Sequence, residues 1–434
     1  MKHMELHILQ SVPVACLNRD DLNSPKTAVF GGVQRARVSS QSWKRAIREM
    51  AKEMDTSMFN GNRSRRMVYE LSKKLEVRQI AKDIAKIIAE QAADIVETLD
   101  SKLDADGFKK IKTLMFFSDA EYDAIANSVT SDVKISAEKV MNSSNVIETF
   151  KEKMNKLDRE DKEEKQEEAK EHLEQLEKRL KKDEAALLKA FSDKSIRAAI
   201  KSAQLKDAAD IALFGRMVAN DPSLTVEAAS MFSHALSTHK VDNEIDFFAA
   251  VDDLQPKEET GAGMTGTLEF NSATYYRFAA LNLDMVADKE HLASMTLEER
   301  KNVVSTFVEA TVKAIPGARK NTMNSNTLPD YVLGIVREKG HPIQLVNAFE
   351  NPIKSTQGYA IESIKRLNAE YADLKETWGI EGSAKITLRN SLKDQLIRKP
   401  GKIPTEEKPE ENTIDGLKVV SLKELIEGMV KYVI

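Results

Sequence analysis

Hydrophobic and polar residues alternate near the start of the chain. In "HMELHIL", Met4, Leu6 and Ile8 occupy every second position, with Glu5 and His7 between them. A period of two predicts a strand with one buried face, because successive side chains of a strand point to opposite faces of a sheet. The segment "QRARVS" has the same period and predicts a second, shorter strand.

From about residue 51 to residue 200 the periodicity becomes helical, charge rises, and Gly and Pro become scarce. We expect a helical insertion, in which residues 158–168 form a solvated helix or a loop because they include no apolar side chain. A dimerising coiled coil is the alternative, but it needs more heptads than this block has. The leucines of its short heptad-like stripe are Leu173, Leu176, Leu180 and Leu187.

The segment after residue 200 predicts a helix that begins after Pro222 and ends near His239. Two strand-like arms follow in residues 241–270, around a centre rich in Pro and Gly. This arrangement is typical of a long projecting hairpin or an ordered loop.

The C-terminal half again mixes helices and strands. "TLEERKNVVSTFVEATVKAIPG" opens with a capping box of Thr296 and Glu299 and predicts a helix that stops at Pro-Gly. "YVLGIV" predicts a buried strand, and "IESIKRLNAEYADLKETW" an amphipathic helix. "RKPGKIPTEEKPEEN" is a polar, Pro-rich linker before a last short helix capped by Ser421. Because such elements flank the charged block, we expect one α+β domain interrupted by a helical insertion.

Composition and charge restrict the classes of function that this chain can have. The 434 residues have a formal net charge of -4, with 31% charged and 41% hydrophobic residues, which is typical of a soluble globular protein of more than one lobe. A surface that binds polyanions must therefore be local. Cys16 is the only cysteine, which excludes an internal disulfide and indicates a reducing compartment. The sequence has no evident secretion or membrane signal, so we expect a cytoplasmic protein with no membrane partner.

One local segment has the required charge. "FGGVQRARVSSQSWKRAIR", residues 30–48, contains four arginines and one lysine and lacks acidic residues. A helix capped by Ser39 or Ser40 would place Trp43, Ile47 and Met50 on one side. Its opposite side would then carry Gln41, Lys44, Arg45 and Arg48.

These residues favour phosphate binding. The helix N-terminus adds N–H donors and a partial positive charge, and Gly31-Gly32 would let the backbone approach a ligand. The cationic surface would be extended by Lys26, Arg35 and Arg37. The alternative is an ordinary solvated helix face. Acidic residues usually accompany the cations of such a face, but here only Glu49 can pair, with Arg45. Aromatic residues are not interleaved, so the segment suits a nucleic-acid backbone better than its bases.

Longer blocks carry a family resemblance. "CLNRDDLNSPKTAVFGGVQRARVSSQSWKRAIR" resembles the N-terminal signature of the Cascade backbone subunit of type I-E CRISPR systems, the CasC family. The family's other blocks follow in the same order: "DIALFGRMVA", "FSHALSTHKVDNEIDFFAAVDDL", "YYRFAALNLDM" and "AIPGARKNTM".

The resemblance implies an α+β fold: an RRM-like (ferredoxin-like) palm, helical fingers and a β-hairpin thumb. Several copies would line up head to tail along one CRISPR RNA (crRNA) and hold its sugar-phosphate backbone. Each thumb would reach the neighbouring copy and flip out one nucleotide at regular intervals, leaving the others free to pair with a target DNA strand. The family implies no catalytic role and no cofactor. Its further partners are the large and small Cascade subunits, the 5′-handle-binding subunit and the crRNA-processing endonuclease.

The resemblance also implies a division of the chain. Residues 1–50, 201–240 and 271–378 would form the palm, with helices in the middle segment. Residues 51–200 would form the fingers, and residues 241–270 the thumb. Residues 379–434 would be a C-terminal extension that includes the Pro-rich linker.

The resemblance also implies roles for individual residues. Met217 would pack on bases beside the kink, with Arg216 next to it, although a core position is the commoner fate of a methionine. The thumb wedge would be Met264 or Leu268. The positions that would hold RNA phosphates are Asn18, Arg19, Lys26, Ser39, Gln41, Lys44, Arg45 and Arg48.

Two other functions remain open. A nuclease could hold Mg²⁺ on the carboxylate pairs Asp20-Asp21 and Asp252-Asp253. Turn chemistry and capping for the first pair, and the polarity of a hairpin for the second, are the favoured explanation. A structural scaffold organised by the charged helices would associate without RNA. We expect no histidine metal site, because His234 and His239 are five residues apart rather than the four that share a helix face.

Overall fold

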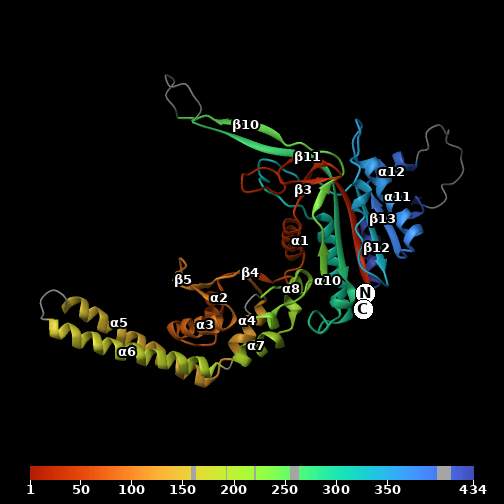
Figure 1. Cartoon of the computed structure of the whole chain (residues 1–434). Coiled ribbons are helices and arrows are strands. Elements are labelled where there is room, and N and C mark those ends of the chain that lie inside the picture. Colours follow the sequence, from red (N-terminus) through yellow and green to blue (C-terminus); the bar gives the residue numbers. More distant parts are fainter. Residues whose placement is uncertain (158–162, 192, 219–220, 255–262, 398–411) are drawn as a thin grey trace. The chain divides into compact units, whose positions relative to one another are not determined.

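The computed structural model describes the chain outside residues 158–162, 192, 219–220, 255–262 and 398–411. The chain divides into two compact units (Figure 1). Unit 1 comprises residues 1–59 and 229–434, and unit 2 comprises residues 60–228. Unit 2 therefore begins and ends later than the insertion expected at residues 51–200, because the first helix of unit 1 continues to Met54.

An 11-stranded sheet forms the centre of unit 1 in the described part of the chain. Its strands are β1 (His3–Ala15), β2 (Thr27–Phe30), β3 (Val33–Val38), β8 (Ser230–Phe232), β9 (Ala235–Ser237), β10 (Glu244–Ala250), β11 (Met264–Asn282), β12 (Tyr331–Arg337), β13 (Ser383–Leu388), β14 (Thr413–Ile414) and β15 (Leu417–Val419). The order is β14-β15-β13-β12-β1-β11-β9-β3-β2, and β8 and β10 also pair with β11. Neighbouring strands are antiparallel, except that β13 and β15 are parallel.

Helices cover both faces of this sheet. The helices of unit 1 are α1 (Ser40–Met54), α9 (Leu283–Val286), α10 (Leu297–Lys313), α11 (Ala360–Trp378), α12 (Asn390–Ile397) and α13 (Leu422–Val430), with a 3-10 turn η3 (Val346–Phe349). α1 packs against α10 and buries Trp43 beside Ile8 of β1. On the opposite face, α11 packs Ile364 and Leu367 into a cluster that contains Leu9.

Because both faces are covered, β1 is buried on both faces, and the prediction of one buried face is wrong. The polar residues form a cluster inside the unit. Glu5 lies 2.9 Å from the His3 ring and 3.4 Å from the His7 ring, and it accepts a 3.1 Å hydrogen bond from Arg337. Burial by itself raises the pKa of Glu5, but hydrogen bonds from His3 and His7 and the other polar contacts lower it to about 2.

Unit 2 is largely helical, as predicted, but its described residues also form two small antiparallel sheets that the sequence analysis missed. Its helices are α2 (Met67–Val77), α3 (Lys82–Val96), α4 (Asp119–Asn127), α5 (Ser131–Leu157), α6 (Glu163–Ala190), α7 (Asp193–Ser202) and α8 (Ala209–Phe214), with 3-10 turns η1 (Leu205–Asp207) and η2 (Pro222–Leu224). The small sheets pair β4 (Asn62–Ser64) with β7 (Met115–Phe117), and β5 (Leu99–Leu103) with β6 (Lys109–Ile111). α5 packs against α6, and Leu180 and Leu187 contact the core of unit 2. These two leucines of the stripe therefore pack within the chain.

The helix predicted between Pro222 and His239 is wrong. Only the 3-10 turn η2 follows Pro222, and β8 and β9 come next. β8 pairs with Ala279–Leu281 of β11, and β9 pairs with Tyr275 and Tyr276 of β11. These backbone hydrogen bonds to a distant strand override the local preference of the segment.

The C-terminal segment is part of the sheet. β13 pairs with β12, β15 adds to β13, and α13 packs on β12, where Gly334 leaves room for Leu425 and Met429. α13 begins with the predicted capping box of Ser421 and Glu424. Residues 398–411, which include most of the Pro-rich linker, lie outside the described residues. None of the described helices is both long and apolar enough to cross a membrane.

Candidate nucleic-acid interface

The start of α1 is held by hydrogen bonds among predicted site residues. The Ser39 hydroxyl caps the helix by accepting from Ser42 N at 3.3 Å, as predicted. Ser39 N donates to the Asn18 side chain at 2.9 Å, and Lys26 N donates to the Asn18 carbonyl at 2.9 Å. Asn18, Lys26 and Ser39 therefore lie together, although they come from two segments of the chain.

The N–H groups at this helix terminus are partly occupied within the protein. Ser40 N donates to the His234 ring at 3.2 Å, and Ser42 N is used by the cap. Burial lowers the pKa of His234, and the nearby charges of Arg37 and Lys26 lower it further. The charges of Arg37 and Lys26 thus make the surroundings of His234 positive, and two N–H groups of the helix terminus are already used within the protein.

The placement of Arg35 differs from expectation. Its side chain is fully buried and does not extend the cationic surface. The guanidinium donates to the carbonyl oxygens of Ser237 at 3.0 Å, Phe349 at 2.7 Å and Glu350 at 3.2 Å. Arg35 therefore ties β3 to β9 and to the end of η3.

The diglycine also has a structural role. Gly31 and Gly32 have φ angles of +60° and +75° and form the two-residue turn between β2 and β3. Two positive φ angles in a two-residue hairpin turn favour glycine at both positions. A Cβ on Gly31 would lie 1.6 Å from the carbonyl oxygen of Glu350, whereas one on Gly32 would meet nothing within 4 Å. The close backbone approach at Gly31 is thus to the protein's own chain, not to a ligand.

The outward side of α1 carries the predicted cations. Lys44 lies with its Nζ 5.4 Å from the centre of the Phe232 ring. Arg45 is exposed and pairs with Glu49 at 2.7 Å, as expected from their spacing. Arg48 is half-buried and Gln41 is exposed. We call Gln41, Lys44, Arg45 and Arg48 the α1 ridge.

A groove of about 730 Å³ lies beside this ridge, entirely within unit 1. It brings Asn18 and Arg19 together with Arg45 and with the segment that follows α10. Its polar lining also includes Ser42, Glu49, Glu53, Lys320, Asn321, Asn324, Ser325 and Asn326. Amides and hydroxyls can donate to phosphate oxygens and exchange hydrogen bonds with ribose hydroxyls.

Residues 320–326 of this groove were missed by sequence reasoning. The block "AIPGARKNTM" contributed to the family resemblance, but it supplied no candidate contact. The usable signal is "RKNTMNSN", a run in which every residue but Met323 is polar, just after the helix stop at Pro316-Gly317. Arg319 links this run to the N-terminal segment, since its guanidinium donates to the Asn23 carbonyl at 3.4 Å.

Arg216 and Met217 belong to unit 2. Arg216 is buried and forms a 2.6 Å ion pair with Glu121. Met217 is 81% exposed, so it is not a core methionine. The two adjacent residues therefore occupy opposite environments.

The hairpin of β10 and the first part of β11 corresponds to the predicted thumb. The two strand-like arms pair in antiparallel register, from Glu244 opposite Phe270 to Ala250 opposite Met264. Figure 1 shows this ribbon extending beyond the remainder of the sheet of unit 1. Met264 is exposed, whereas Leu268 is half-buried. Most of the tip predicted at residues 255–266 lies outside the described residues.

The described part of the thumb exposes large apolar side chains and also carries acidic ones. Ile245 and Phe247 are 69% and 66% exposed. The described thumb residues include acidic side chains but no Lys or Arg. An exposed ribbon of this kind is suited to contact with protein rather than with phosphates.

The carboxylate pairs take part in turns. Asp20 Oδ1 accepts from Leu22 N at 2.9 Å and from Ser24 N at 3.0 Å. Asp252 Oδ1 accepts from Leu254 N at 3.0 Å. Among the described residues, no group of three or more His, Cys, Asp or Glu side chains is arranged to hold a metal ion.

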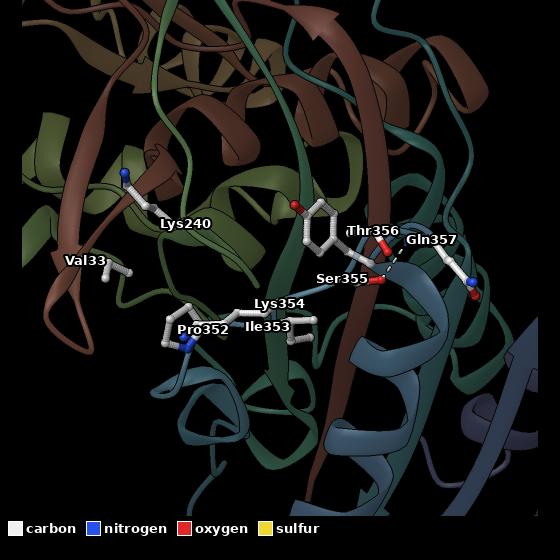
Figure 2. A pocket seen from close by; sticks show the side chains of 9 residues that line it. Val33, Lys240, Pro352, Ile353, Lys354, Ser355, Thr356 and Gln357 are labelled. Carbon is white, nitrogen blue, oxygen red and sulfur yellow. Dashed lines mark hydrogen bonds between the residues drawn. The ribbon is translucent and has the colours of Figure 1, made fainter.

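A second depression, of about 770 Å³, lies beside the start of α11 (Figure 2). Figure 2 shows Val33 and Lys240 on one side of it and Ser355, Thr356 and Gln357 on the other. None of these side chains was a candidate from the sequence, and Lys240 pairs with Asp242 at 2.9 Å.

Comparison with known proteins decides the family. Residues 4–409 match the model of a family described as CT1975-like protein. The chain belongs to this family. A search of curated proteins returned no match for this CT1975-like chain.

The chain is also similar to chains of solved structures. The CT1975-like chain is similar over 100% of both lengths, at 26% identity and a TM-score of 0.72, to a chain of a "CRISPR RNA-guided surveillance complex, pre-nicking". A chain of a second "CRISPR RNA-guided surveillance complex" matches with a TM-score of 0.62 at 23% identity, over 99% of each chain, and shares the fold.

Proposed function

We propose that this CT1975-like chain is the crRNA-binding backbone subunit of a type I-E Cascade surveillance complex and has no catalytic role. The observation that carries the proposal is the likeness, over the full length of both chains, to a chain of a solved CRISPR RNA-guided surveillance complex. The α1 ridge and the adjoining groove supply a surface of the matching chemistry.

In this proposal, unit 1 holds the sugar-phosphate backbone. The cations of the α1 ridge, with Lys26, Arg19 and Lys320, attract phosphates, and the asparagines of the groove contact phosphate and ribose. Such contacts carry no base information, so one protein can hold any guide sequence. Base pairing between the guide and a target DNA strand then supplies the specificity, as in other RNA-guided effectors.

Several copies would assemble head to tail on one crRNA into a helical filament, because a heterologous contact need not close. The exposed apolar thumb supports this step, since a two-stranded ribbon is marginally stable in water unless something packs on it. We propose that it packs on the next copy, and that Met264 or Leu268 helps to flip out nucleotides at regular intervals. The sheet and helices of unit 1 would be the RRM-like palm.

The remaining partners follow from the same assembly. We propose that the filament joins the large and small Cascade subunits, the 5′-handle-binding subunit and the crRNA-processing endonuclease in the cytoplasm. No cofactor or metal is required, because holding RNA needs only hydrogen bonds and charge.

Co-expression with a CRISPR array tests the proposal. We expect the tagged chain to co-purify with a short, uniform RNA and with other Cascade subunits. Lys44→Glu/Arg48→Glu should abolish assembly on RNA, as measured by light scattering. The charge-matched control Lys423→Glu/Lys431→Glu alters exposed lysines at α13 and should assemble normally.

Three results would contradict the proposal. Cleavage of labelled RNA in Mg²⁺, lost on Asp20→Asn or Asp252→Asn, would favour a nuclease. Self-association without RNA would favour a helical scaffold. Normal assembly of Lys44→Glu/Arg48→Glu on RNA would remove the α1 ridge from the interface.

A further inference from the structure

A small cavity lies inside unit 1, among residues of α1, α10 and the sheet. Its polar lining consists of Trp43 of α1, Thr311 of α10, Arg277 of β11, and Ser233 from the turn between β8 and β9. The rest of the lining is apolar, with Ile8, Ile47, Phe232, Ala235, Phe278 and Ala279. Four polar side chains therefore meet within an apolar layer of the core.

Three of these side chains carry a buried polar atom that has no hydrogen-bond partner in the described part of the chain. The atoms are Trp43 Nε1, Ser233 Oγ and Thr311 Oγ1. Trp43 is 3% exposed and Thr311 is 1% exposed, so their polar atoms cannot turn to bulk solvent. Such groups are rare in folded proteins, because a buried N–H or hydroxyl loses its hydrogen bonds to water and must regain them inside.

The fourth polar side chain, Arg277, is a buried cation. Its guanidinium donates to Gln10 Oε1 at 2.6 Å and to the carbonyl oxygens of Thr311 and Val312. Its Cζ also lies 3.7 Å from the centre of the Trp43 ring. Burial lowers the pKa of Arg277 to about 9 from its ordinary value of 12.5. The acceptors around this cation are thus neutral groups.

The size of the cavity limits what it can hold. Its volume is about 10 Å³. One buried water needs roughly 10–15 Å³ and two to four polar partners, whereas cavities that stay dry are apolar. The charge of Arg277 favours a small anion, but chloride is larger than water, and the guanidinium already has acceptors. Size and the three partnerless atoms together favour water.

We propose that this cavity is a binding site for one structural water molecule that joins α1, α10 and the turn after β8. The water accepts a hydrogen bond from Trp43 Nε1–H and exchanges hydrogen bonds with the hydroxyls of Ser233 and Thr311. A water molecule has two donors and two acceptor positions, so it satisfies all three groups at once. The site lies on the inner side of α1, away from the α1 ridge, and it does not depend on RNA binding.

A crystal structure of the full chain, at a resolution that shows ordered waters and from crystals grown in sodium bromide, tests the site directly. We expect one water in the cavity, within hydrogen-bond distance of at least two of Trp43 Nε1, Ser233 Oγ and Thr311 Oγ1. We expect no anomalous signal from bromide at this position. A bromide peak in the cavity would show an anion site and overturn the proposal, and so would an empty cavity.

A double-mutant cycle tests the same water in solution. Ser233→Ala and Thr311→Val each remove one hydroxyl and nearly keep the shape of the side chain. Because both hydroxyls bind one water, losing either weakens the contribution of the other. In urea unfolding followed by tryptophan fluorescence, the double variant should change the unfolding constant by a factor at least about twofold smaller than the product of the two single factors.

The matched control combines Thr311→Val with Ser355→Ala, whose hydroxyl lines the depression beside α11 instead of this cavity. The factors of this pair should simply multiply. If the factors of Ser233→Ala and Thr311→Val also multiply, the two hydroxyls share no water and the proposal fails. Circular dichroism identifies a variant that does not fold, and the crystal structure of the unsubstituted chain then remains the deciding test.

Discussion

The turn between β2 and β3 offers a sharp test of the fold beside the α1 ridge. Gly31→Ala and Gly32→Ala place the same methyl group at adjacent positions with positive φ. A Cβ on Gly31 would lie 1.6 Å from the Glu350 carbonyl oxygen, whereas a Cβ on Gly32 would meet no atom within 4 Å. The two variants therefore share backbone strain and differ in packing.

The magnitudes follow from these contacts. An alanine in the left-handed region costs about 1 kcal/mol, and we expect this loss for Gly32→Ala. At Gly31 the backbone must also move by about 2 Å to reach a normal contact distance. That shift disturbs the carbonyls of Phe349 and Glu350, which accept from the buried Arg35 at 2.7 and 3.2 Å. Weakening hydrogen bonds to a buried cation adds about 2 kcal/mol, so we expect a total near 3 kcal/mol for Gly31→Ala.

Tryptophan fluorescence is a suitable assay, because both tryptophans, Trp43 and Trp378, belong to unit 1. Urea unfolding followed in this way reports the stability of unit 1 without a tryptophan signal from unit 2. A Gly31→Ala variant no less stable than Gly32→Ala would refute the packing argument.

Further predictions concern the buried cluster, the thumb and the groove. The pKa of Glu5 is lowered to about 2 from its ordinary value of 4.5, so its ionised form stabilises the folded state above pH 4.5, and this contribution is lost as the pH falls toward 2. Glu5→Gln should cost roughly 3 kcal/mol at neutral pH, and urea unfolding should show the difference from wild type shrinking below pH 4.5; a pH-independent difference would contradict this. Ile245→Ser/Phe247→Ser should weaken assembly of copies on RNA in analytical ultracentrifugation and leave the melting temperature of the free chain unchanged, and undiminished assembly would remove the thumb from the contact. Lys320→Gln should lower the salt slope of RNA binding by about 0.7 per copy, and an unaltered slope would remove this lysine from the interface.

Elements with strong local signals were predictable from the sequence. The Ser39 cap and the four- and three-residue spacing of Trp43, Ile47 and Met50 placed α1 correctly, because capping and amphipathicity act within one or two turns. The capping box of Thr296 and Glu299 likewise located α10. The two strand-like arms around a turn-rich centre predicted a hairpin or an ordered loop, and the described parts of the arms pair as a hairpin.

Elements that depend on distant partners were not predictable. β8 and β9 exist because they hydrogen-bond to β11, and their own sequence resembles a helix. Burial of the second face of β1 depends on α11, which lies more than 300 residues away along the chain. It also depends on the contacts of Glu5 with His3 and His7, through which the buried polar side chains pair with one another.

Part of the candidate site was likewise predictable from local sequence, and part was not. Spacing along α1 identified the ridge, whereas the groove became visible only when residues 320–326 were placed beside Asn18 and Arg45. Charge alone could not separate the exposed Arg45 from the buried Arg35 and Arg216, because burial of an arginine depends on acceptors from other segments. For Met217 the resemblance supplied a role, and the structure supplied the exposure that such a role needs.

We propose that unit 1 binds ribose-phosphate linkages without regard to base identity. The most direct measurement is the affinity of the purified chain for two single-stranded RNAs of equal length and unrelated sequence, over a range of salt concentrations. We predict equal affinities, parallel salt slopes, and a lowered slope for Lys44→Gln with both RNAs. Absence of binding at low ionic strength, or a strong preference for one sequence, would contradict the claim.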